Sequence, residues 1–265
     1  MSSAHGADNR RVVSFMGVSL DNLDAEGLLE RVIVYSKTKM RRKIMYMNAD
    51  CTLIAMRDRE YMSVLNRADL VYADGVGVVL GARLFGERLP GRMTGADFMP
   101  DFCDRFANAG LSIFLLGGRE GVAAKAAQKL KQRCPGLKVA GTHHGYFDHE
   151  RSSSVIEAIN RANPHILLVA FGAPHQEKWI DRNAGMLDIP VVWGVGGLFD
   201  FLSGNTRRGP KWLLDNGFEW LCRLMAEPQR LWKRYLVGNS RFVLYLLYHR
   251  FISKKYRGFL TGTYR

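Results

Sequence analysis

Five short apolar runs recur along this chain, and each ends in glycine or a polar side chain. They cover residues 44–47, 69–73, 111–116, 165–171 and 189–193, and helical patterns fill most of the intervening sequence, including one helix predicted over residues 52–66. Strands that alternate with helices of this length indicate βαβ units and a parallel sheet. We therefore predict an α/β fold with a mostly parallel sheet and helices on both faces.

Charge divides the chain into three parts. Residues 1–10 are polar and predicted to be disordered. Residues 11–205 are predicted to form the α/β domain, and residues 206–265 a basic helical appendage that holds 13 Lys and Arg but three acids. The appendage therefore carries most of the formal net charge of +13, which indicates an anionic partner.

The appendage has the composition of a membrane-associating amphipathic segment. After Glu227 it contains nine cations and no acid, interleaved with Trp, Tyr, Phe and Leu at helical spacing. A basic amphipathic helix with aromatic residues on its other face suits an anionic bilayer surface. The alternative is a helix packed on the body with a solvated basic face. Nucleic acid is not expected as a partner, because no recognition motif accompanies the charge.

The sequence also bears on localisation. It has no charged leader followed by an apolar stretch, and no apolar run near 18 residues. These features predict neither secretion nor a membrane span. We expect a cytoplasmic protein that is peripheral on the inner face of the cytoplasmic membrane.

Asp74 is the first candidate for chemistry. It follows the apolar run 69–73 and precedes Gly75 and Gly77, so a buried strand would deliver its carboxylate to the edge of the sheet. Ligands of open α/β sheets bind beyond the carboxyl ends of the strands. The alternative is that Asp74 only caps the next helix, and this stretch alone does not separate the two.

Glycine or small polar residues end the other strands as well. The candidates for contact with a substrate are Asn48, Gly75, Gly117, Gly118, Gly172, Gln176 and Gly196. Together they predict one rim of the sheet without bulky side chains, suited to a nucleotide or sugar lying against the backbone. Gly117 and Gly118 open a helix, where free N–H groups favour an anion.

The sequence offers little support for a dinucleotide site or a metal site. A dinucleotide fingerprint would need a third glycine three residues after Gly77, whereas Gly81 follows one residue too late. There is also no HExxH, no paired cysteine and no Asp-x-Asp to hold a metal on a nucleotide diphosphate. We expect no cofactor and no required metal.

A string of motifs resembles one known family, the WecG/TagA/CpsF glycosyltransferases (glycosyltransferase family 26), across nearly residues 12–250. The motifs, in order, are Asn48-Ala49-Asp50, Ala73-Asp74-Gly75-Val76-Gly77, Arg92-Met93-Thr94-Gly95, Phe114-Leu115-Leu116-Gly117-Gly118, Gly145-Tyr146-Phe147, Gly172-Ala173-Pro174-His175-Gln176-Glu177, Gly194-Val195-Gly196-Gly197, Arg207-Arg208-Gly209-Pro210, Gly217-Phe218-Glu219-Trp220 and Arg230-Leu231-Trp232. The resemblance is specific because it rests on many separated motifs.

The resemblance implies an activity, substrates and partners. Members transfer a sugar from a UDP-sugar to a polyprenyl-diphosphate-linked saccharide, with inversion at the anomeric carbon, in the synthesis of bacterial surface or exported polysaccharide. It also implies a Rossmann-like body and a C-terminal appendage that reaches the membrane and completes the active site. The sequence does not identify whether the transferred sugar is a hexose or an N-acetylhexosamine, nor whether the protein forms a homo-oligomer.

The resemblance also implies roles for individual residues. The base is Asp74, and the residues that hold substrates are Asn48, Arg92 and Gln176. Arginines of the appendage that would meet the diphosphate are matched by Arg223 and Arg230, with Lys233 at a third basic position and Tyr46 where relatives often have threonine.

An inverting transfer needs one carboxylate to take the acceptor proton and positive charge to stabilise the departing diphosphate. Asp74 and the arginines would supply these. Two alternatives remain at this point: an NAD-dependent oxidoreductase, and a membrane-binding module without enzymatic activity.

Overall fold

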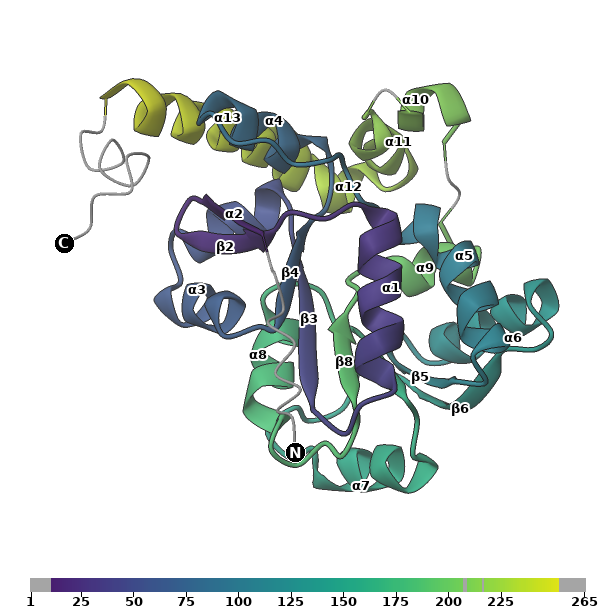
Figure 1. Cartoon of the computed structure of the whole chain (residues 1–265). Helices are drawn as coiled ribbons and strands as arrows, with labels where there is room; N and C mark the ends of the chain where they lie inside the picture. Colours follow the sequence, from purple (N-terminus) through teal and green to yellow (C-terminus); the bar gives the residue numbers. More distant parts are fainter. Residues whose placement is uncertain (1–10, 207–208, 216, 253–265) are drawn as a thin grey trace, which may run out of the picture.

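The computed structural model describes residues 11–206, 209–215 and 217–252, so the predicted disordered segment 1–10 lies outside the described residues. Its centre is a six-stranded sheet in which every hydrogen-bonded pair of strands is parallel (Figure 1). In order across the sheet the strands are β4 (Leu70–Ala73), β3 (Arg42–Met47), β8 (Val191–Gly194), β7 (Ile166–Ala170), β5 (Ser112–Gly117) and β6 (Lys138–His143). This architecture confirms the predicted α/β fold.

Helices flank the sheet, and a two-stranded hairpin of β1 (Val12–Phe15) and β2 (Val18–Asp21) precedes them. The helices up to residue 202 are α1 (Ala25–Ser36), α2 (Ala49–Ala55), α3 (Arg59–Asn66), α4 (Val76–Leu84), α5 (Gly95–Asn108), α6 (Val122–Arg133), α7 (Ser153–Ala162), α8 (His175–Asn183) and α9 (Leu198–Leu202).

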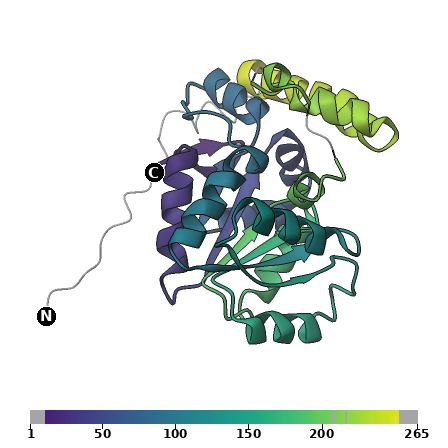
Figure 2. The ribbon, with the colours of Figure 1, turned by 90° about the vertical axis from the view of Figure 1, so that its right-hand side faces the viewer.

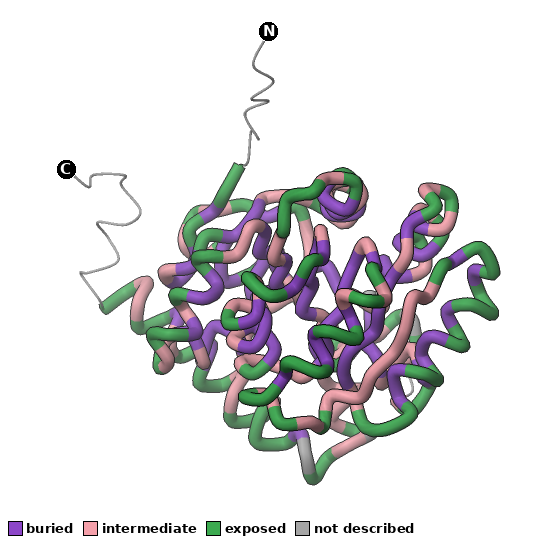
Figure 3. The backbone as a smooth tube through the Cα atoms, turned by 90° about the horizontal axis from the view of Figure 1, so that it is seen from below, coloured by how far each residue is buried: buried purple, intermediate pink, exposed green. Residues whose placement is uncertain are grey.

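The sheet forms the centre of the hydrophobic core. Every residue of β4, β7 and β8 is buried, as expected for parallel strands covered on both faces. Buried segments gather in the interior of the molecule and exposed ones on its outside (Figure 3). Trp193 on β8 is fully buried, and its ring stacks on Phe98 at 5.6 Å between centroids and meets Tyr72 edge-on at 6.1 Å. This aromatic contact packs α5 against the strands that end near Asp74.

The single helix predicted over residues 52–66 is wrong, because the chain forms α2 and α3 there. Asp58 breaks the pattern, since its side chain accepts a hydrogen bond from the backbone N–H of Tyr61 and so caps a new helix. Asp58, followed two residues later by Glu60, is a sequence signal for the start of a helix. The apolar spacing over residues 52–66 continues through it and predicted one uninterrupted helix.

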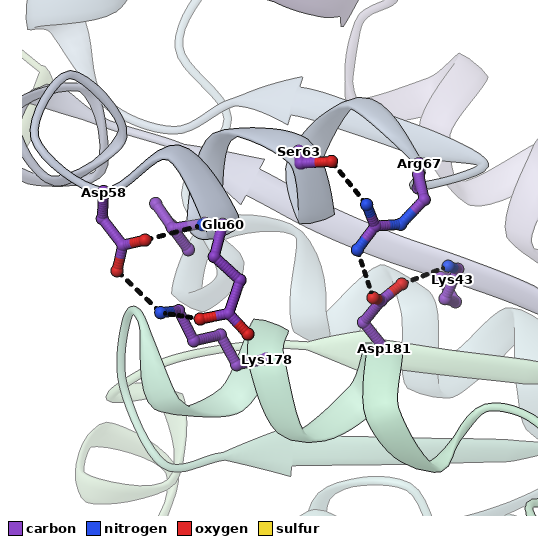
Figure 4. Close-up of polar contacts among 8 residues, drawn as sticks. Lys43, Asp58, Glu60, Ser63, Arg67, Lys178 and Asp181 are labelled. Carbon is purple, nitrogen blue, oxygen red and sulfur yellow. Dashed lines mark hydrogen bonds and ion pairs between the residues drawn. The ribbon is translucent and has the colours of Figure 1, made fainter.

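Ion pairs fix α8 against α3 and β3 (Figure 4). Asp181 on α8 lies 2.7 Å from Lys43 and 2.6 Å from Arg67, and Lys178 lies 2.5 Å from Glu60. The exposed pairs contribute little individually, but they form two clusters, one around partly buried Lys43 and Asp181 and one in which Lys178 meets Asp58 and Glu60. Both clusters hold in place the helix on which Gln176 lies.

The described part of the appendage is helical and runs along the upper edge of the molecule (Figure 2). Its residues share a cavity with those that follow β3 and β4. Its helices are α10 (Lys211–Asp215), α11 (Glu219–Ala226), α12 (Pro228–Trp232) and α13 (Asn239–Leu247), with π-helical segments at Lys233–Gly238 and Tyr248–Ile252. Phe242 and Leu246 of α13 join the core, whereas Leu244 and Phe251 are exposed. Within these described residues, no helix combines the length and apolar character needed to cross a membrane.

Candidate active site

Asn48 and Asp74 meet because their strands are neighbours. Met47 and Ala73 pair in the parallel register of β3 and β4, so the residue after each strand emerges at the same edge. The backbone N–H of Asp74 donates to the carbonyl of Met47 at 2.9 Å. The side-chain amide of Asn48 donates a long hydrogen bond of 3.5 Å to the Asp74 carboxylate.

Asp74 is not a helix cap. Gly75 is the N-cap residue of α4, with φ of 87°, and no side chain caps that helix. A residue with a Cβ would be strained at this backbone conformation, so Gly75 allows the sharp turn between Asp74 and α4. Asn48, in contrast, caps α2, because its Oδ1 accepts from the N–H of Cys51 at 3.0 Å.

A cavity of about 500 Å³ opens beside Asp74, between the body and the appendage. Its volume is in the range of small-molecule sites. Of the residues predicted from sequence, the structure brings together Asn48, Asp74, Gly75, Arg92 and Arg223 on the walls of this cavity.

Ion pairs between acids and arginines form part of the polar wall of the cavity. Arg223 donates to one carboxylate oxygen of Glu219 from Nε at 3.2 Å and from Nη2 at 2.7 Å. The other oxygen of Glu219 lies 3.6 Å from Arg92. Arg234 pairs with Asp50 at 3.1 Å. Three guanidinium groups therefore converge near Asp74 from the body and from the appendage.

The environment of Asp74 makes it a weak acid near neutral pH. Burial raises the pKa of its carboxyl to about 6, while the positive charge of Arg223 opposes this rise and the negative charge of Glu219 adds to it. A carboxylate with this pKa is ionised at pH 7 and still accepts a proton readily. That is the property expected of a general base.

Gln176 lies outside this cavity. It is fully buried, its Oε1 accepts from the backbone N–H of Gly196 at 2.9 Å, and its Nε2 donates to Glu177 at 2.7 Å. The structure therefore places Gln176 and Gly196 in contact with each other, as a link between α8 and the loop after β8.

The other predicted glycines also lie away from Asp74, beyond β8 in the sheet. Gly117 ends β5, Gly118 donates to the carbonyl of Ala170 at 3.1 Å, and the carbonyl of Gly172 accepts from the N–H of Gln176 at 3.0 Å. None of Gly117, Gly118, Gly172 and Gly196 is among the described residues that line the cavity.

The appendage supplies residues that sequence reasoning did not single out. Glu219 and Arg234 line the cavity, whereas Lys233 lies over the ring of exposed Trp232, at 5.6 Å. Arg234 follows Arg230 by four residues, one helical turn, which is the signal that would have favoured it over Lys233. Arg230 lies on α12, but its side chain is outside the described part of the structure.

No metal site accompanies these residues in the described parts of the chain, where no group of three or more His, Cys, Asp or Glu side chains is arranged to hold an ion. The carboxylates on the cavity wall lie instead beside arginines.

Comparison with known proteins agrees with the motifs and the geometry. The sequence model of the "Glycosyl transferase WecG/TagA/CpsF family" matches residues 13–256. The chain belongs to this family. It is similar to the N-acetylglucosaminyldiphosphoundecaprenol N-acetyl-beta-D-mannosaminyltransferase of Bacillus subtilis (strain 168), at 35% identity over 76% of this chain and 78% of that protein. A protein of the same name from Bacillus spizizenii is 32% identical over 78% of this chain and 79% of its own length.

Membership of the family makes this protein a glycosyltransferase and confirms the family resemblance drawn from the motifs. The oxidoreductase and non-enzymatic alternatives are therefore wrong. Gly81, the glycine that falls one residue too late for a dinucleotide fingerprint, lies within α4 and packs against Phe15 and Leu246.

Proposed function

We propose that this glycosyltransferase moves a hexose or N-acetylhexosamine from a UDP-sugar to a polyprenyl-diphosphate-linked saccharide, with inversion at the anomeric carbon. The observation that carries the proposal is the partly buried carboxylate of Asp74, with a pKa of about 6, in one cavity with three arginines. The names of the Bacillus relatives, which specify a diphosphoundecaprenol-linked acceptor, support the same acceptor class here.

In this mechanism an acceptor hydroxyl attacks the anomeric carbon from the face opposite the leaving group. The new bond forms between the acceptor oxygen and that carbon, the bond to the UDP oxygen breaks, and the acceptor proton passes to Asp74. Asn48 orients the carboxylate through its amide. UDP departs as an anion, and the guanidinium groups of Arg92 and Arg223, which meet at Glu219, stabilise the charge that develops on it.

The appendage would also place the enzyme on the membrane that holds the acceptor. We propose a peripheral position on the inner face of the cytoplasmic membrane, where UDP-sugars are available. The support comes from the excess of basic residues after Glu227 and from exposed apolar side chains on the outward face of α13 and beyond it, such as Leu244, Leu247 and Phe251.

The test is a screen of UDP-sugars against a synthetic polyprenyl-diphosphate N-acetylglucosamine, with release of UDP and the anomeric configuration of the product as readouts. Asp74→Asn is expected to abolish transfer and to leave UDP binding largely intact. Exposed Asp188 is not among the residues that line the cavity, and Asp188→Asn is the matched control. Near-normal turnover by Asp74→Asn, or retention of configuration, would contradict the proposed mechanism.

A further inference from the structure

The cavity beside Asp74 continues into an apolar groove between α4 and α13. We call this the α4–α13 groove; it is lined by Val76, Leu80, Leu84, Phe242, Val243 and Leu246. These six side chains are all apolar, whereas the end of the same cavity near Asp74 carries arginines and carboxylates. One continuous space therefore has an ionic end and an apolar end.

The two helices lie side by side and run in the same direction. A Cβ added at Gly77 would lie 3.4 Å from the ring of Phe242, and one added at Gly81 would lie 3.0 Å from Leu246. Successive turns of α4 therefore meet successive turns of α13. Small residues on α4 allow this close approach, and Phe242 and Leu246 become the buried floor of the groove.

The far end of the α4–α13 groove is also fixed. Arg250, in the π-helical segment after α13, donates from Nε to the carbonyl of Leu84 at 3.0 Å. This hydrogen bond satisfies a carbonyl at the carboxyl end of α4 and places a cation where the helix dipole favours one. The groove therefore has a defined length, roughly 12 Å from Val76 to Leu84 at 1.5 Å per helical residue.

The walls of the groove are exposed although they are apolar. Leu80 on α4 is 55% exposed and Val243 on α13 is 51% exposed, while the floor between them is buried. Single exposed apolar side chains are ordinary on protein surfaces. A pair that lines a cavity with a buried apolar floor favours an apolar ligand, since water in such a groove finds few hydrogen-bonding partners.

The ionic end of the cavity indicates that the same ligand also carries an anionic group. Arg234, in the segment that leads directly into α13, lines the cavity near Asp74 and would bind the acceptor's diphosphate through charge-assisted hydrogen bonds. A ligand that fills both ends carries a diphosphate joined directly to a hydrocarbon chain. We infer that the α4–α13 groove binds the first isoprene units of a polyprenyl diphosphate, with the diphosphate held at the arginine end.

This inference rests on the proposed function for the identity of the occupant, and it adds that the protein binds the lipid chain as well as the head group. The remainder of the chain would leave past the exposed apolar residues Leu247 and Phe251 into the bilayer. Apolar area covered in the groove then contributes to the affinity for each acceptor.

The test measures binding of short prenyl diphosphates to the full chain, without detergent or vesicles and below the concentration at which the ligands aggregate. The probes are inorganic diphosphate, dimethylallyl diphosphate, geranyl diphosphate and farnesyl diphosphate, and the readout is the dissociation constant by calorimetry. Affinity is expected to rise with each added isoprene unit. Affinity that does not depend on chain length would overturn the inference.

Variants locate the effect. Leu80→Gln and Val243→Gln are each expected to weaken farnesyl diphosphate roughly tenfold and to leave inorganic diphosphate unchanged. The matched control is Leu244→Gln, on the same helix but outside the groove and 66% exposed, which should leave both affinities unchanged. Both substituted groove side chains are about half exposed, so the variants should fold, and circular dichroism checks this. An unaltered preference for farnesyl diphosphate in both groove variants would overturn the inference.

A probe with an unbranched hydrocarbon chain tests whether the groove prefers isoprene units. Dodecyl diphosphate carries a straight chain without methyl branches, and tighter binding of this probe than of farnesyl diphosphate would assign the groove to an acyl chain instead. Because none of these measurements requires a donor or catalysis, the outcome is independent of sugar transfer. Groove-dependent prenyl binding without transfer from any UDP-sugar would refute the proposed function alone.

Discussion

Glu219 holds Arg223 by two hydrogen bonds to one carboxylate oxygen, of 3.2 and 2.7 Å, and directs its other oxygen at Arg92. The acid comes from the appendage, one arginine from the body and the other from the appendage. Glu219 therefore joins the appendage to the body and orients both arginines toward the cavity.

Glu219→Gln is expected to shift the pH dependence of transfer. The negative charge of Glu219 raises the pKa of Asp74, so its removal lowers that pKa and keeps the base ionised in more acidic solution. The acidic limb of kcat/KM should move to lower pH than in the unaltered protein. Glu157→Gln, an exposed position on α7, is the control. A limb that stays in place or moves to higher pH would count against the assigned role of Glu219.

The unaltered enzyme should itself show an acidic limb near pH 6. Burial raises the pKa of Asp74 to about 6, and only the ionised form accepts the proton from the acceptor. We therefore expect kcat/KM to fall about tenfold for each pH unit below about 6. Return of activity after transfer back to pH 7.5 separates this titration from denaturation. A limb near the ordinary pKa of an exposed aspartate would contradict the role of burial.

The part of the site that depends on neighbouring strands could be predicted from the sequence. Asn48 and Asp74 each follow an apolar run, and parallel strands bring such positions to one edge. The same argument applied equally to Gly117 and Gly172, yet sheet order places their strands beyond β8. No periodicity within a run reports which strands are neighbours, so the sequence alone could not separate the two groups.

The site residues that the appendage contributes were harder to predict from the sequence. Arg223 was identified by resemblance, but Glu219 and Arg234 were not, because their position depends on how α11 and the segment after α12 pack over the body. The burial of Gln176 could not be predicted from the sequence either, because it also depends on how helices and loops pack. A polar side chain at the start of a helix suggests a ligand contact, and only the packed structure shows that its partners are Gly196 and Glu177.

Two glycines of α4 should respond in opposite ways to alanine. At Gly77 the nearest atoms to an added Cβ are 3.4 and 3.6 Å away, so Gly77→Ala should gain up to about 1 kcal/mol of helix propensity. At Gly81 the ring of Phe15 lies 2.9 Å away, and overpacking of a core costs about 1–3 kcal/mol. Urea unfolding should show Gly81→Ala as the less stable variant. Equal stabilities would refute the close packing of α4.

Glu177 should make stability depend on pH. Its side chain is fully buried, one carboxylate oxygen has no hydrogen-bond partner within the structure, and burial raises its pKa from 4.5 to about 7. Because the folded pKa exceeds the unfolded value, its contribution to stability is complete below pH 4.5 and is lost as pH rises to about 7. The loss is on the order of 3 kcal/mol, at about 1.4 kcal/mol per pH unit.

Glu177→Gln removes this titration while an acceptor for Gln176 remains. The variant is expected to be more stable than the unaltered protein at pH 8 and to lose that advantage at pH 5, as measured by urea unfolding at both values. Comparison between the two proteins cancels the contributions of other titrating groups, including Asp74. An advantage of the variant that grows toward acidic pH would show that the buried carboxyl has the opposite effect.

The exposed apolar side of the appendage should determine membrane binding. Leu244 and Phe251 are 66% and 67% exposed, and the basic residues after Glu227 add attraction to anionic lipid. The double variant Leu244→Gln/Phe251→Gln should sediment less with phosphatidylglycerol vesicles, and added salt should weaken binding of the unaltered protein. Met186→Gln, exposed just after α8, provides a matched control. Because the substituted side chains face solvent, the fold should persist, and undiminished sedimentation of the double variant would place the membrane contact on another surface.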